Sequence, residues 1–225
     1  MMSVERKHII KPFLLLCEGR DAEGFLIQYL NSKELSQDQR LSNDIQVFDF
    51  GGNEELSNFL MNLKNMDKFD QVTSLAIIRD AEKDYAKACK EVSNSLEKCG
   101  FISSERCGIW AQDEAGLKIG FMLFPLDGNA GTLEDLCLRI LSEKNSASLL
   151  STVDTFLTDM ESSNGRHYRR KHKNKLYTYL SSSDEYVTMQ LGIASSAGAF
   201  DWSSGALEPL KCFLANGFRV TQEDT

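Results

Sequence analysis

The sequence lacks any run of apolar residues long enough to cross a membrane, and it lacks a CxxC pair of cysteines. Its six cysteines, at positions 17, 89, 99, 107, 137 and 212, are scattered, and most fall at apolar positions of expected helices or strands. A zinc site and a disulfide framework are therefore not expected, and a reducing cytoplasm fits best. The short apolar run after Lys11 leads into an acidic segment, so we interpret it as a strand rather than a signal peptide.

The sequence also has no excess of basic residues. The chain has 25 Lys and Arg against 33 Asp and Glu, which gives a net charge of −8. This balance argues against a general nucleic-acid coat and against a protein of the membrane surface. It leaves room for a local basic contact. With 42% hydrophobic and 26% charged residues, the chain has the composition of an ordinary globular protein.

Four acidic residues stand directly after two short apolar segments. Glu18 follows the segment PFLLLC, and Asp80, Glu82 and Asp84 follow the segment SLAIIR. Each segment is unbroken and precedes a helical pattern, which is typical of a strand buried on both faces of a parallel sheet. Because α/β folds bind ligands at the carboxyl ends of such strands, we expect the carboxylates to form a site there. Binding of a divalent metal ion is the simplest way to neutralise this concentration of negative charge.

The remaining pattern predicts an α/β sandwich of the Rossmann type. Residues 45–50 predict another strand, and residues 107–111 and 118–124 predict two paired strands. Apolar residues at helical spacing follow most of these strands. Strands that alternate with helices along the chain favour a mostly parallel central sheet with helices on its faces.

The chain changes character after a polar, Ser-rich segment at residues 142–152. Beyond it the pattern is mostly helical, so we expect a core over residues 1–145 and a mostly helical part over residues 146–225 that packs on it. This second part holds the dense basic segment of the chain, residues 166–175. A basic segment is usually a solvated face, but this one opposes the net charge and is an equally good candidate for a nucleic-acid backbone. Its candidate contact residues are Arg166, Arg169, Arg170, Lys171 and Lys173.

The order of the acids resembles the Toprim fold of topoisomerases, DnaG-type primases and OLD-type nucleases. That fold has a glutamate, usually followed by glycine, after its first strand and an Asp-x-Asp motif after its third. Glu18-Gly19 matches the first motif, and Asp80-Ala81-Glu82 matches the second, with glutamate for the second aspartate. The resemblance implies that Asp80 and Glu82 bind metal, with Asp84 as an additional acid. It implies that Glu18 is a general acid or base, or a further ligand.

A closer resemblance is to the small Toprim-like proteins of unknown function called DUF3226. Their pattern has an E-G-x-D opening, a Gly-Gly turn after the second strand and a G-T-L-E-D helix start. Residues 18–21, 51–52 and 131–135 match these three motifs in the same order. The resemblance covers most of the chain, including residues 173–179 and the neighbourhood of Asp201-Trp202.

Two positions depart from the family pattern. A second acid usually lies four residues after the glutamate, where this chain has Ala22, flanked by Asp21 and Glu23. Glu82 is longer than the usual aspartate. Both departures concern metal geometry and activity more than the fold. By itself, the acidic segment that begins at Asp80 is also typical of a plain helix N-terminus, where carboxylates favour the positive end of the dipole.

Glu134 and Asp135 have two interpretations. The one we favour is a helix start in which Thr132 is the N-cap and Asp135 completes a weak capping box. OLD-type nucleases also use acids from a later element, so the resemblance makes Glu134 a candidate metal ligand.

Phosphodiester hydrolysis on DNA or RNA, of the nuclease type, is the leading expectation. Carboxylates that hold Mg²⁺ or Mn²⁺ would position phosphate oxygens and stabilise the charge that develops on them, with one ion or two. No tyrosine is placed as a strand-transfer nucleophile, which disfavours topoisomerase chemistry. The main alternative is a non-catalytic interaction or metal-binding module that works with a separate ATPase partner, as in OLD systems. A third hypothesis is a small phosphorylated ligand. The oligomeric state stays open.

Overall fold

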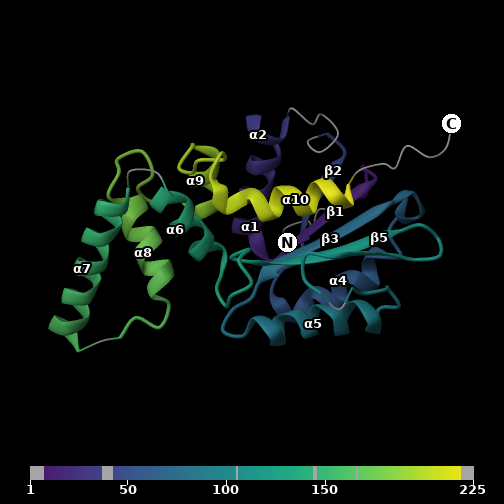
Figure 1. The fold of residues 1–225 in the computed structure, drawn as a ribbon, viewed down its shortest axis with the longest axis horizontal. Coiled ribbons are helices and arrows are strands. Elements are labelled where there is room, and N and C mark those ends of the chain that lie inside the picture. The colour runs from purple at the N-terminus through teal and green to yellow at the C-terminus, as the bar shows by residue number, and fades with distance from the viewer. Residues whose placement is uncertain (1–7, 37–42, 105, 144–145, 166, 219–225) are drawn as a thin grey trace, which may run out of the picture.

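A computed structural model describes residues 8–36, 43–104, 106–143, 146–165 and 167–218. Within these residues the strands form one sheet in the order β2-β1-β3-β5-β4 (Figure 1). Neighbouring strands are parallel except for β4, which is antiparallel to β5. The predicted α/β sandwich with a mostly parallel sheet is therefore confirmed. The strands are β1 (Phe13–Cys17), β2 (Ile45–Asp49), β3 (Ser74–Asp80), β4 (Trp110–Gln112) and β5 (Lys118–Phe124).

Helices cover both faces of the sheet (Figure 1). One face carries α4 (Leu56–Leu63) and α5 (Tyr85–Lys98), and the other carries α1 (Gly19–Leu30) and α10 (Glu208–Gly217). All of β1 is buried, and its side chains alternate between two apolar cores. Leu14 and Leu16 belong to the core with α4 and α5, whereas Leu15 belongs to the core with α1. This two-sided burial is why an unbroken apolar run forms the strand.

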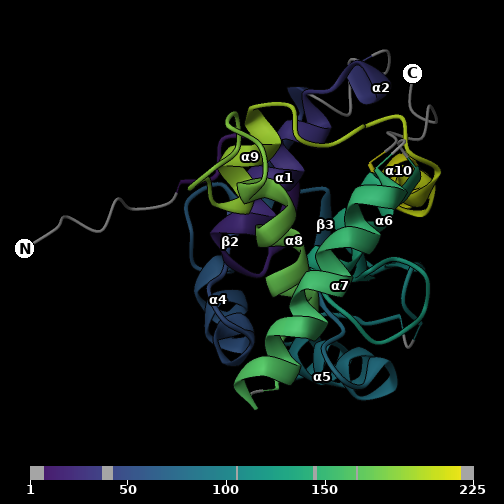
Figure 2. The ribbon, with the colours of Figure 1, turned by 90° about the vertical axis from the view of Figure 1, so that its left-hand side faces the viewer.

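Helices α6, α7, α8 and α9 gather at the end of the sheet where the parallel strands finish, and Figure 2 looks at that end, with α7 and α8 in front. Helix α6 packs against α7 and α8, and α9 packs against α1. Their bounds are α6 (Leu133–Glu143), α7 (Ala147–Asn164), α8 (Lys171–Ser181) and α9 (Leu191–Ser196). The short helix α2 (Lys33–Ser36) follows α1 and contacts it instead.

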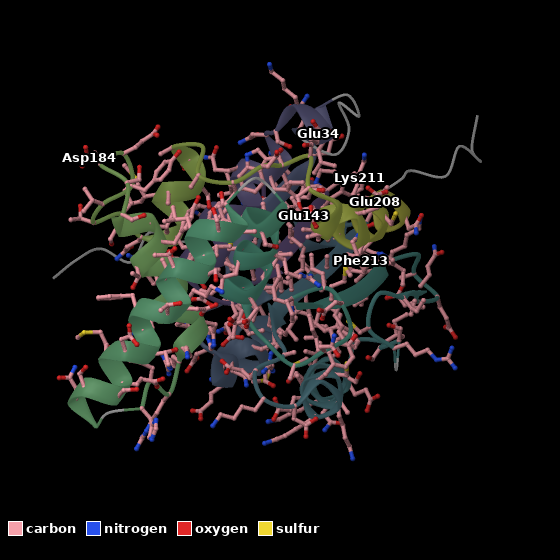
Figure 3. All side chains as sticks on the ribbon, turned by 60° about the vertical axis from the view of Figure 1, so that its left-hand side comes forward. Glu34, Glu143, Asp184, Glu208, Lys211 and Phe213 are labelled. Carbon is pink, nitrogen blue, oxygen red and sulfur yellow. The ribbon has the colours of Figure 1, made fainter. Side chains whose placement is uncertain are left out.

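The last helix, α10, returns to the sheet. Phe213 lies on the sheet side of α10 and Lys211 on the opposite side (Figure 3), and the Phe213 ring stacks on Trp110 with 4.7 Å between centroids. Phe218, just after the helix, stacks on Phe13 of β1 at 5.3 Å. Residues beyond position 146 therefore share one apolar core with the sheet.

Two glycines bring α9 against α1. A Cβ atom added to Gly24 would lie 2.8 Å from the Cα of Gly192, closer than real Cβ contacts, so a larger residue would push the helices apart. This close approach also brings the Gly192 N–H within 3.0 Å of Asp21 Oδ1. The crossing fixes the start of α9 beside the first turn of α1.

No helix in the described part of the chain is both long and apolar enough to span a membrane. None of the six cysteines, all of which lie in described segments, forms a disulfide in the structure.

Candidate active site at the carboxyl edge of the sheet

A pocket of about 770 Å³ opens where β1 and β3 end. Its walls come from the turns after β1 and β2, the end of β3, the start of α6, helix α8 and the segment before α9. The acidic residues that line it are Glu18, Asp21, Asp80, Glu82 and Glu134. The parallel register of β1 and β3 places the ends of both strands at the same edge, which is why acids far apart in sequence meet here.

Glu18 is the first residue after β1, and its N–H donates to the carbonyl of Ile78 in β3. Its side chain is 19% exposed, and its Oε2 atom is buried without a hydrogen-bond partner. Burial raises the pKa of Glu18 above its ordinary value, although the Arg79 guanidinium opposes the shift. A carboxyl group with a raised pKa holds its proton more readily than an ordinary glutamate, and its ionised form would be stabilised by a bound cation.

Arg79, the residue before Asp80 in β3, forms an ion pair with Glu18. Its side chain is only 2% exposed, its Nε lies 3.6 Å from Glu18 Oε2, and its Nη1 lies 3.2 Å from Glu91 Oε2 in α5. Arg79 is not among the site residues predicted from the sequence. The signal was present, because a cation that closes an otherwise apolar buried strand needs acidic partners nearby.

Asp80 connects the end of β3 to the start of α6. Its Oδ1 accepts a hydrogen bond of 2.9 Å from the N–H of Leu133, the first residue of that helix. Burial, followed by the negative charge of Glu134, raises the pKa of Asp80 to about 7, although the hydrogen bond from Leu133 lowers it in part. Asp80 is therefore the acid that a bound cation would relieve most.

Glu134 is 5% exposed and has two close partners. Lys173 Nζ lies 2.9 Å from Oε1, and Thr132 Oγ1 donates to Oε2 at 2.8 Å. Burial alone would raise the pKa of Glu134, but the hydrogen bonds from Lys173 and Thr132, together with the charge of Lys173, hold it below its usual value. Asp135 accepts the N–H of Thr132 at 2.8 Å, as expected for a helix start. Capping thus falls to Asp135, while Glu134 faces the pocket.

Asp21 and Ala22 line the pocket from α1. The Asp21 carboxylate already accepts two hydrogen bonds within the protein, from the Gly192 N–H and, at 3.3 Å, from the Tyr177 hydroxyl. Ala22, at the position where the family pattern has an acid, is 4% exposed.

Glu82 and Asp84 lie on the loop that follows β3. The main chain of Glu82 has a φ of 57° and pairs with Gly131 through two hydrogen bonds of 2.8 Å, which fixes the exposed Glu82 at the pocket rim. Asp84 lines a neighbouring depression with Arg79 instead of this pocket. Its Oδ1 caps α5 by accepting the N–H of Lys87 at 2.9 Å.

The basic segment does not form one surface. Lys171 binds Glu161 of α7 at 3.6 Å, whereas Arg169 and Arg170 are exposed just before α8. Arg166 lies outside the described residues. Helical periodicity separates these side chains, and within the described part of the segment Lys173 alone lines the pocket.

The donor set suits a hard cation. Among the described residues, no three His, Cys, Asp or Glu side chains are arranged to hold a metal ion by themselves. Mg²⁺, however, is commonly held by one or two carboxylates, with water and substrate phosphates as its other ligands. A cation would oppose the burial and negative charge that raise the pKa of Asp80. Glu18 Oε2 has no hydrogen-bond partner and lies 3.6 Å from Arg79 Nε. These two oxygen donors fit a site that substrate completes.

Comparison with known proteins assigns the chain to a family without assigning an activity. No curated protein and no solved structure matches it significantly. The model of one family, described as a protein of unknown function (DUF3226), matches residues 12–219. The match spans most of the chain and confirms this part of the resemblance found in the sequence, while the Toprim relationship stays a prediction. The chain belongs to the DUF3226 family.

Proposed function

We propose that this pocket carries out Mg²⁺-dependent phosphodiester hydrolysis on nucleic acid, as a Toprim-like nuclease site. The observation that carries the proposal is the convergence of Glu18, Asp80, Glu82 and Glu134 with Lys173 in one pocket at the carboxyl edge of the sheet. Acids after the first and third strands of a β2-β1-β3 arrangement also support a Toprim relationship.

The chemistry divides among the residues by their surroundings. Asp80 would hold Mg²⁺, with Glu82 and Glu18 as the nearest further acids, and the ion when bound would polarise a phosphate oxygen and acidify a water. The raised pKa of Glu18 makes it a better candidate than an ordinary glutamate for a group that carries a proton. Arg20, which is exposed and lines the pocket, can attract phosphate.

Helix α8 supports a nucleic-acid substrate rather than an isolated phosphate. Arg169 and Arg170 are exposed just before the helix whose residue Lys173 enters the pocket. A nucleic-acid backbone with one phosphate in the pocket would have these two exposed arginines as further basic partners. Such contacts would offset the repulsion between the acidic pocket and the phosphate backbone.

The test is cleavage of labelled single- and double-stranded DNA and RNA in Mg²⁺ or Mn²⁺ by the purified protein. Asp80→Asn and Glu18→Gln should abolish cleavage, and Glu18→Gln should keep substrate binding. Asp84→Asn is the matched control. Asp84 is on the same loop as Glu82, but its side chain caps α5 and lies outside the pocket. Cleavage that survives Asp80→Asn, or that Asp84→Asn abolishes equally, would refute this assignment of the site.

One observation favours the alternative of a non-catalytic module that works with a separate protein, such as an ATPase. Asp21, Asp80 and Glu134 each already accept hydrogen bonds from the protein, so the pocket can be stable without metal. Calorimetric titration with Mg²⁺, in the presence and absence of a short oligonucleotide, separates the two functions. Saturable binding that Asp80→Asn removes supports the nuclease, and its absence under both conditions supports the module.

A further inference from the structure

Lys173 reaches the acidic pocket from a distant part of the chain. It lies on α8, which packs against α6, and its Nζ atom is 2.9 Å from Oε1 of Glu134 at the start of α6. The lysine side chain is 36% exposed and the Glu134 side chain only 6%, so the ammonium covers the carboxylate at the pocket wall. The charge of a nearly buried acid is thus neutralised inside the pocket rather than at the surface.

The ammonium acts on more than one acid. Burial by itself would lower the pKa of Lys173, but the hydrogen bond and charge of Glu134, followed by the charge of Asp80, raise it above its ordinary value. Lys173 therefore stays charged at all physiological pH values. It is close enough to Asp80 and Glu134 to interact with both, whereas Arg79 neutralises Glu18 on the other side of the pocket.

We propose that the Lys173 ammonium occupies the place of a second divalent cation, so that the pocket takes one Mg²⁺ and not two. This inference rests on the proposed function, which it deepens. Two-metal sites place a second ion between shared carboxylates, where it stabilises charge on the phosphate. Here Glu134 already binds a fixed positive charge, and a second Mg²⁺ would have to displace it. Asp80, with Glu18 and Glu82, is left for the single ion.

A lysine in this place differs from a metal ion in two ways. It is present before substrate arrives, because its position depends on α8 and not on the metal concentration. It also carries one charge instead of two, so the pocket stays net acidic and one divalent ion can still bind. The expected dependence of metal binding on concentration is that of a single site.

The test counts bound Mn²⁺ per chain from the electron paramagnetic resonance signal of free Mn²⁺, at pH 8 and without substrate. We expect the wild-type protein and Lys173→Arg to bind one ion, and Lys173→Met to bind two. Methylammonium added to Lys173→Met should compete with the second ion and leave the first. Lys173→Gln, whose amide can still donate to Glu134, serves as the neutral variant if the methionine variant does not fold.

Two ions bound to the wild-type protein would overturn the inference, whatever the variants show. One ion bound to the wild-type protein and to the neutral variant alike would also overturn it, while the proposed metal site would stand. A wild-type protein that binds no Mn²⁺ even with an oligonucleotide present would overturn the metal site itself, and this inference with it.

Discussion

Replacing Asp80 by asparagine should make the metal-free protein more stable at pH 8. Burial and the charge of Glu134 raise the pKa of Asp80 from 3.8 to about 7, so its ionised form is disfavoured in the folded state. The stabilisation that comes from the protonated form is complete below about pH 4 and is lost as the pH rises through 7. Asparagine keeps the oxygen that accepts the Leu133 N–H and carries no charge.

The magnitude follows from the shift. About three pKa units at about 1.4 kcal/mol per unit give roughly 4 kcal/mol as an upper bound for pH values well above 7. Because Asp80 is partly accessible to solvent, we expect about half of this, close to 2 kcal/mol. The gain should shrink as the pH falls and vanish below about pH 4, where Asp80 is neutral in both the folded and the unfolded state.

Glu134→Gln is the matched control, because the same change of charge should have the opposite sign there. The pKa of Glu134 is held low by Lys173 and Thr132, so its charge stabilises the fold above its unfolded pKa, and this contribution is lost as the pH falls through the folded value. Glutamine would leave the Lys173 ammonium without its carboxylate partner, 2.9 Å away. We expect a loss of about 2 kcal/mol at pH 8.

The assay is equilibrium urea unfolding in EDTA at pH 5 and pH 8, followed by circular dichroism. The expectation is that Asp80→Asn raises the free energy of unfolding more at pH 8 than at pH 5, whereas Glu134→Gln lowers it at pH 8. An Asp80→Asn protein that is less stable than the wild type at pH 8 would refute it, because Asp80 would then be a stabilising ion.

Three further predictions concern metal, core and substrate. Mg²⁺ affinity should fall about tenfold per pH unit below 7 and level off above it, because Asp80 must release its proton to bind, as calorimetry at several pH values can show. Arg79→Met should cost about 3 kcal/mol in urea unfolding, because it removes the buried partner of Glu18. Replacing Arg169 and Arg170 by glutamate should weaken oligonucleotide binding. The plot of log binding constant against log salt concentration should become less steep, by about 2 in slope.

Each of these has a result that contradicts it. A Mg²⁺ affinity independent of pH from 5 to 8 would remove Asp80 from the metal site. An Arg79→Met protein within about 0.5 kcal/mol of the wild type would show that the buried ion pair contributes little. For the substrate, Lys90→Glu on the exposed side of α5 is the control, and an equal change of salt slope there would indicate non-specific attraction.

Local patterns determine most of the fold. The apolar segments before Glu18 and after Thr73 could be predicted as buried strands because both of their faces are covered by helices, so no alternation appears in the sequence. The strand at Lys118–Phe124 was also predicted with its bounds. Its antiparallel partner is shorter and later than expected, at Trp110–Gln112, because Trp110 is held by Phe213 of α10. That contact spans half the chain and leaves no local signal.

The site was predictable where strand order decides it and unpredictable where side chains meet across helices. Glu18 and Asp80 follow adjacent parallel strands, so their meeting at one edge could be inferred from the sequence. The partners of Lys171 and Lys173 could not, because Glu161 and Glu134 are on other helices, and the segment looked like one continuous basic patch. Which face of α8 each lysine occupies depends on how α8 packs against α6 and α7.

The pocket also has an order of assembly during synthesis. All of its lining acids precede α7 in the chain, whereas Lys173 and the Gly192 N–H that binds Asp21 are made later. Until α8 packs against α6, Glu134 lacks its ion pair with Lys173, and the carboxylates at the edge of the newly formed sheet repel one another. Contacts this far apart in sequence form slowly. We therefore expect divalent cations to stabilise the partly made chain more than the finished one, acting as a temporary counter-charge that Lys173 later replaces.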